Sequence, residues 1–131
     1  MGKICKVLIV EDNPDVRDLL GDLFGYEGFH FSCVAEGAAF RAELAKGDAE
    51  VAIIDIMIPG GENGLALAEL AAGQGCGVIL VTGHHDHFER LENYGHRYLL
   101  KPFSVGSLLD LVEETLLATR ARCEAGGRRF G

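Results

Sequence analysis

The sequence has few cysteines, and they form no pattern that marks a disulfide framework or a zinc site. The four are Cys5, Cys33, Cys76 and Cys123, and no two of them stand in a C-x-x-C pair. Zinc sites and disulfide-rich domains need such spacings. Cys5 and Cys33 fall in short apolar runs, where a free cysteine behaves as a small hydrophobic residue. We therefore expect reduced thiols in a cytoplasmic protein.

Basic residues are scarce as well, and so are long apolar runs. The chain has 12 Lys and Arg against 20 Asp and Glu, which gives a formal net charge of −8. Nucleic acids and anionic membranes bind basic surfaces, so this balance argues against both as partners. The apolar run after Lys6 is too short for a signal peptide or a membrane-spanning helix. We expect a soluble protein that has neither nucleic acid nor a membrane as its partner.

The sequence contains enough apolar residues to form the core of one folded domain. Its 131 residues suit a single domain, and its hydrophobic content of 48% argues against disorder. No internal repeat and no linker interrupts the chain before its glycine-rich end, AGGRRFG. We assign residues 1–123 to the domain and residues 124–131 to a flexible C-terminal tail.

Short apolar runs alternate with segments of helical periodicity. The runs typical of buried strands are residues 7–10, 29–34, 51–54, 78–81 and 98–100. Helices are predicted from the cap Asn13 to a stop at Gly28, at 38–46, at 65–72, from residue 86, and from the cap Ser104. This alternation predicts an α/β domain in which helices cover both faces of a parallel sheet. In such doubly wound folds, functional groups gather beyond the carboxyl ends of the strands.

Charged and hydroxyl residues stand at those strand ends. They are Glu11 and Asp12 after the first strand, Asp55 and Thr82 at the ends of the third and fourth, and Lys101 after the fifth. An unpartnered acid at the end of a buried strand would only destabilise the protein, so Asp55 needs a function. Acids on neighbouring strands would lie roughly 5 Å apart and repel one another. They therefore need a cation nearby, or one of them must bind a proton.

Magnesium is the cation that these acids favour. Oxygen ligands without His or Cys select a hard ion, and a partly hydrated Mg²⁺ fits them best. Lys101 offers a second positive charge and Thr82 offers a hydroxyl. Such a set of groups suits a phosphoryl group, with Asp55 as the nucleophile that becomes an aspartyl phosphate.

Four motifs at these positions resemble one protein family. VLIVEDN, IIDIMIPG, LVTG and LLKPF, in this order, resemble the receiver domain of two-component response regulators. The resemblance covers the chain to about Cys123. It implies a flavodoxin-like, doubly wound fold whose five-stranded parallel sheet has the order 2-1-3-4-5. It also implies a sensor histidine kinase or histidine phosphotransfer protein as phosphate donor, and a downstream protein target.

The resemblance implies roles for the acids. Asp55 would be the phosphorylation site and, with Asp12 and the backbone carbonyl of Met57, a direct Mg²⁺ ligand. Glu11 would act on the ion through a bound water. A domain of this kind catalyses its own phosphorylation from phosphohistidine and its own slow dephosphorylation, and is not a classical enzyme.

Further roles concern the phosphoryl group and the response to it. Lys101 and Thr82 would bind phosphoryl oxygens, and the peptide bond before Pro102 would be cis. Thr82 and Tyr98 would form a switch that changes the surface made by the fourth helix, fifth strand and fifth helix. Tyr98 as a plain packing residue is the alternative.

The chain departs from the family pattern in its loops. Gly64 comes one residue later than usual, and the interval from Thr82 to Lys101 is a few residues shorter than is common. We therefore expect a short fourth helix and an altered output surface. Met57 and His84 occupy positions that tune dephosphorylation in the family, which leaves the lifetime of the phosphate open.

Three other functions fit the sequence poorly. Neighbouring histidines such as His84, His85 and His87 rarely converge on one tetrahedral zinc ion. The acidic EDNP turn would repel the phosphate of an FMN-binding flavodoxin, and an aspartate-nucleophile phosphatase would need an acid where Met57 stands. Two alternatives stay open: a phosphate sink or shuttle in a phosphorelay, and a receiver-fold interaction module without phosphate turnover. A stand-alone receiver and a domain of a longer chain are both compatible with the sequence.

Overall fold

Five parallel strands form one sheet in the order β2-β1-β3-β4-β5. The structure is a computed structural model and describes residues 6–56, 63–83 and 95–126. The strands are β1 (Lys6–Val10), β2 (His30–Val34), β3 (Val51–Asp55), β4 (Gly77–Thr82) and β5 (Arg97–Leu100). The described helices are α1 (Pro14–Tyr26), α2 (Gly37–Leu44), α3 (Gly64–Gly73) and α5 (Val105–Gly126). The predicted fold class and strand order are confirmed. The helix predicted from residue 86 lies outside the described residues.

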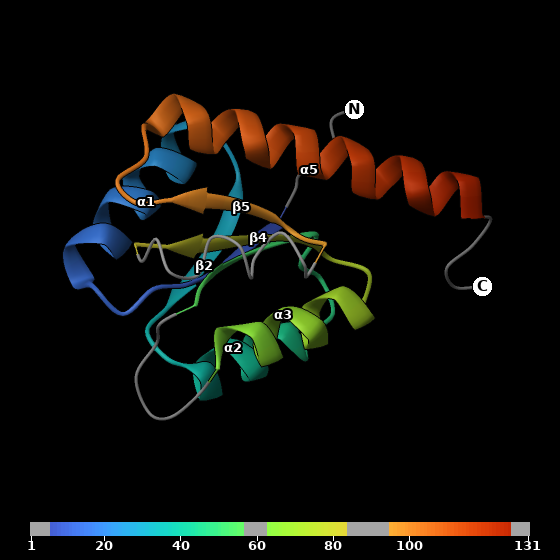
Figure 1. Cartoon of the computed structure of the whole chain (residues 1–131), viewed down its shortest axis with the longest axis horizontal. Helices are drawn as coiled ribbons and strands as arrows, with labels where there is room; N and C mark the ends of the chain where they lie inside the picture. The colour runs from blue at the N-terminus through green and yellow to red at the C-terminus, as the bar shows by residue number, and fades with distance from the viewer. Residues whose placement is uncertain (1–5, 57–62, 84–94, 127–131) are drawn as a thin grey trace.

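The apolar residues of the strands alternate between the two faces of the sheet. Leu8, Ile54 and Leu80 join a core cluster with residues of α2 and α3. The intervening strand residues join a second cluster with α1 and α5. Figure 1 shows the corresponding layers, with α2 and α3 together on one side of the sheet and α5 on the other. Since the central strands are buried on both faces, their sequences are continuously apolar instead of alternating.

Two predicted helix caps are present in the structure. The side chain of Asn13 accepts hydrogen bonds from the backbone N–H groups of Asp15 and Val16, at the start of α1. The Ser104 hydroxyl accepts one from the N–H of Ser107, at the start of α5. These contacts satisfy N–H groups that have no partner inside the helix.

Three details of the helices differ from the sequence prediction. α2 ends at Leu44 instead of residue 46, because Lys46 and Gly47 donate to carbonyls only three residues back and tighten the last turn. α5 continues past Cys123 to Gly126, while a flexible tail beyond it stays a prediction. The helical spacing of apolar residues predicts one stripe on α1, made of Val16, Leu19, Leu20, Leu23 and Phe24, but Leu19 is 56% exposed. The buried face of α1 is instead formed by Leu20 and Phe24.

The C-terminal half of α5 is fastened to the sheet by a close approach and an ion pair. A Cβ atom added to Gly77 would collide with the side chains of Thr115 and Thr119. Farther along, Arg120 donates two hydrogen bonds to the carboxylate of Glu50, from Nε at 3.0 Å and from Nη2 at 2.9 Å. This paired geometry is the strongest that an arginine and a carboxylate adopt.

None of the helices in the described part of the chain combines the length and the apolar character that crossing a membrane requires.

The Gly77 contact leads to a test of packing. We expect Gly77→Ala to destabilise the domain by about 1–3 kcal/mol, because the added methyl group overpacks a site that cannot yield. Thr115 and Thr119 are both buried, and the Thr115 hydroxyl donates to the carbonyl of Leu111, which holds its rotamer. Urea unfolding measures the change. Gly106→Ala is the matched control, since a Cβ there meets nothing within 4 Å. Equal stability of both variants would contradict this account of the packing.

Candidate functional site

The polar residues predicted to form a site come together at the carboxyl ends of the central strands. Val10 of β1 pairs with Ile54 of β3, so the residues that follow them are neighbours. Asp55 pairs in turn with Val81 of β4. The backbone N–H of Lys101 donates to the carbonyl of Thr82 at 2.8 Å, which extends the same edge to β5. Parallel pairing alone therefore brings these residues together.

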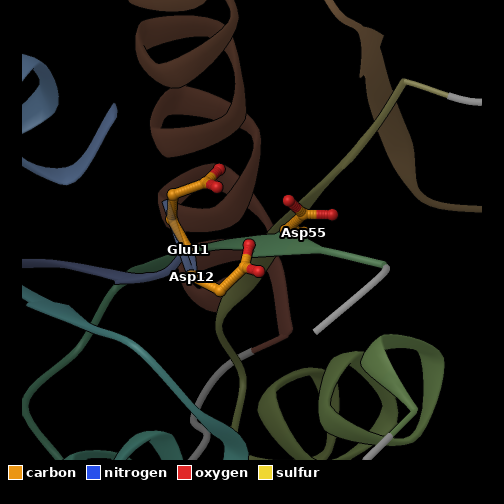
Figure 2. A group of neighbouring side chains, drawn as sticks. All are labelled: Glu11, Asp12 and Asp55. Carbon is orange, nitrogen blue, oxygen red and sulfur yellow. The ribbon is translucent and has the colours of Figure 1, made fainter. Parts of the chain in front are cut away.

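Three carboxylates form the centre of the site. Oxygen atoms of Glu11, Asp12 and Asp55 lie within 4.8 Å of one another, and Figure 2 shows the three side chains gathered where β1 and β3 end. Glu11 is 3% exposed and Asp55 6% exposed, whereas Asp12 is exposed. The separation agrees with the distance expected from adjacent strands.

Lys101 bridges the two buried carboxylates. Its Nζ lies 2.9 Å from Oδ2 of Asp55 and 3.0 Å from Oε1 of Glu11. Three formal negative charges face this one positive charge, so the cluster has two negative charges in excess. Such an excess attracts a divalent cation.

The electrostatics of Glu11 and Lys101 follow from this bridge. Burial raises the pKa of the Glu11 carboxyl, and the nearby charge of Asp55 adds to the rise, although hydrogen bonds from Lys101 and the Asn13 N–H oppose it. Burial alone would lower the pKa of the Lys101 ammonium, but its hydrogen bonds to Asp55 and Glu11 and their charges raise that pKa above its usual value. The bridge therefore keeps Lys101 charged at neutral pH.

Glu11 and Asp12 have different surroundings, although they are adjacent in the chain. Glu11 accepts a hydrogen bond from Lys101 on Oε1 and, at 3.2 Å, from the Asn13 N–H on Oε2. Its own N–H donates to the carbonyl of Val34 at 2.9 Å. Both carboxylate oxygens of Glu11 thus have protein partners, while the carboxylate of Asp12 is exposed to solvent.

Gly64 is a site residue whose role the sequence analysis missed. A Cβ at this position would lie 2.6 Å from Cα of Ile56 and 2.7 Å from the carbonyl oxygen of Asp55. The start of α3 therefore packs directly on the backbone that carries Asp55, which only a residue without a side chain permits. The signal in the sequence is a glycine directly before the apolar segment predicted as a helix at 65–72.

The remaining predicted residues fall into two groups. Thr82 is completely buried at the end of β4, and Tyr98 of β5 is partly buried against the core cluster on the α2 and α3 side. The peptide bond between Lys101 and Pro102 is cis. The other group, Met57, His84, His85 and His87, lies outside the described residues.

Known proteins match this chain over most of its length. The family model of the response regulator receiver domain matches residues 7–113. The transcriptional regulatory protein AruR of Pseudomonas aeruginosa is 32% identical over 139 residues, which cover 98% of this chain and 57% of that protein. The sensory transduction protein RegX3 of Mycobacterium tuberculosis is 32% identical over 113 residues, 84% of this chain and 50% of that protein. The chain thus spans about half the length of these relatives.

A solved structure supports the same relationship. The crystal structure of a CheY-like response regulator receiver domain protein from Methanospirillum hungatei has a TM-score of 0.82 and 25% identity, and the match covers 92% of this chain and 99% of that one. The chain belongs to the response regulator receiver domain family of two-component signalling.

Proposed function

We propose that this receiver domain accepts a phosphoryl group on Asp55 and then signals through contacts with another protein. One observation carries the proposal: the nearly buried carboxylate of Asp55 is held by Lys101 at 2.9 Å in a cluster with two further carboxylates. A carboxylate nucleophile and a fixed cation beside it are the groups that phosphoryl transfer needs. A purely structural ion pair would not require the two additional acids.

The donor chemistry of the site fits Mg²⁺. Its three carboxylates supply only oxygen atoms, which a hard divalent ion prefers. Asp12 and Asp55 would bind the ion directly together with the backbone carbonyl of Met57, and Glu11 would act through a water. When bound, Mg²⁺ would neutralise the excess negative charge and polarise the phosphoryl oxygens.

Each protein group has a defined part in the transfer. An oxygen of Asp55 attacks the phosphorus of a phosphohistidine, the P–N bond breaks, and the imidazole leaves with the electron pair and takes a proton from solvent. Lys101, already directed at Asp55, balances the charge of the incoming phosphoryl oxygens. The hydroxyl of Thr82, which lies on the neighbouring strand, donates to one of these oxygens. The low exposure of the site strengthens these interactions.

The partners follow from this chemistry. A sensor histidine kinase or a histidine phosphotransfer protein in the cytoplasm would supply the phosphoryl group, and a protein target would respond to it. The relatives are named as transcriptional and sensory transduction proteins, but this chain matches only about half of their length. The proposal therefore concerns the receiver part that they share.

The acceptor is tested by covalent labelling. Acetyl phosphate with Mg²⁺ should add one phosphoryl group to the protein by intact mass, and Asp55→Asn should abolish it because the amide is not a nucleophile. Asp110→Asn, an exposed acid on α5, is the matched control and should label normally. If the unaltered protein gains no phosphoryl group from any donor, an interaction module without phosphate turnover is the better description.

The metal ligands are tested by comparing the two adjacent acids. Asp12→Asn should weaken Mg²⁺ binding more than Glu11→Gln, by roughly tenfold or about 1.4 kcal/mol. The reason is that both oxygens of Glu11 already accept hydrogen bonds, whereas the Asp12 carboxylate is exposed. Isothermal titration calorimetry gives both dissociation constants. The reverse order would show that the roles of the two acids are exchanged.

The response to phosphate is tested at Thr82 and Tyr98. Beryllofluoride with Mg²⁺, a mimic of the phosphoryl group, should shift backbone amide signals across residues 83–103, including Tyr98. Thr82→Val removes the hydroxyl and nearly keeps the shape, so it should shrink the shifts at Tyr98 while Asp55 still accepts phosphate. This follows if the phosphoryl group shifts a two-state equilibrium through its contact with the hydroxyl. Shifts confined to the immediate surroundings of Asp55 would favour a phosphate sink.

A further inference from the structure

Arg17 contacts the acidic turn without touching its carboxylates. This residue lies on α1, and its guanidinium reaches back to the turn that joins β1 to the helix. Nη1 donates a hydrogen bond to the carbonyl oxygen of Glu11 at 2.9 Å and another to that of Asp12 at 3.0 Å. These two carbonyls belong to the residues that supply two of the three clustered carboxylates.

The two carbonyls flank the Cα atom of Asp12. One belongs to the peptide group before this atom and the other to the peptide group after it. Because each peptide group is planar, fixing both of them fixes the backbone angles of Asp12 and the direction of its Cα–Cβ bond. Arg17 therefore helps to set the backbone conformation of Asp12, together with the Asn13 N–H, which lies in the second of these peptide groups and donates to Glu11.

Asp12 depends on this contact more than its neighbours do. Glu11 is held by Lys101, by the Asn13 N–H and by the carbonyl of Val34, and Asp55 is fixed in β3 and bound by Lys101. In the described part of the chain, Arg17 is the one side chain that donates a hydrogen bond to Asp12. Without it, the backbone of Asp12 loses one of its anchors, and repulsion favours movement of the carboxylate away from two other negative charges.

We propose that Arg17 is a positioning residue for Mg²⁺, which holds Asp12 in the cluster before the ion binds. The inference rests on the proposed function and adds a residue that the acidic cluster alone does not indicate. Arg17 suits the task because its guanidinium is always charged, so it offsets repulsion among the acids. It also binds only carbonyls, which leaves the carboxylate oxygens available to a cation.

A role limited to helix stability does not explain the contact. The first N–H groups of α1 are already capped by the side chain of Asn13, and the guanidinium has donors but no acceptor, so it cannot cap them. Arg17 also lines a surface groove of about 570 Å³ between α1 and β2, together with the exposed Asp18 and Asp22. Loss of the guanidinium therefore leaves no buried cavity, and the domain should still fold.

The test measures metal binding to the full chain in the absence of any phosphodonor. Arg17→Met keeps the length of the side chain without its hydrogen bonds or charge, and Arg17→Lys keeps the charge with a different donor geometry. We expect the Mg²⁺ dissociation constant from calorimetry to rise about five- to tenfold in Arg17→Met, with a smaller rise in Arg17→Lys. Arg122→Met is the control, because this exposed arginine lies far from the acidic cluster. The start of α5 at Val105 follows closely after Lys101, and Arg122 is 17 residues farther along the helix, about 25 Å from that start.

A second readout separates positioning from stability. At saturating Mg²⁺, the rate of labelling by acetyl phosphate in Arg17→Met should recover to within about twofold of the unaltered protein, because Asp55 and Lys101 are held independently. A merely structural role would instead lower the melting temperature without metal and leave the dissociation constant unchanged. An unaltered dissociation constant in Arg17→Met, alongside normal Mg²⁺ binding by the unaltered protein, overturns this inference alone. Failure of the unaltered protein to bind Mg²⁺ overturns both this inference and the proposed function.

Discussion

The repulsion between three carboxylates at the ends of adjacent strands is the constraint on which the site depends. Their oxygens lie within 4.8 Å of one another, and Lys101 bridges the two buried ones with its positive charge. Such a cluster opposes folding, and it persists because the surrounding structure fixes its members. The sheet supplies that structure, since Asp55 ends a fully buried strand and Glu11 follows four buried residues of β1. Held in this way, the three carboxylates form a set of oxygen atoms that suits a divalent cation.

Two kinds of contact hold the cluster, and they have different consequences. Lys101 binds carboxylate oxygens directly, so it shares the atoms that an ion or a phosphoryl group would use. Arg17 and Gly64 act on the backbone, the first by hydrogen bonds to carbonyls and the second by allowing α3 to approach Asp55. Backbone contacts leave the carboxylates available.

Much of this arrangement was predictable from sequence, because it depends on local patterns. Continuous apolar runs predict strands buried on both faces, and the residues that follow them must meet at one edge of a parallel sheet. The cluster and its bridge by Lys101 follow from those two facts. By contrast, the roles of Arg17, Gly64 and Gly77 depend on which atoms approach one another after folding, and a single sequence contains no such distances. The exposure of Leu19 was missed for a similar reason, since the width of a buried helix face is set by its neighbours.

The two ends of the sheet serve different purposes, and the difference lies in how each is packed. At the amino ends of the strands, Gly77 lies against Thr115 and Thr119 of α5, and Arg120 pairs with Glu50. These contacts are dense, and the opposite charges are satisfied. At the carboxyl ends, like charges are concentrated and only partly compensated. The rigid end offsets the cost of the charged one, so the fold accommodates a repulsion between carboxylates that a divalent cation would reduce.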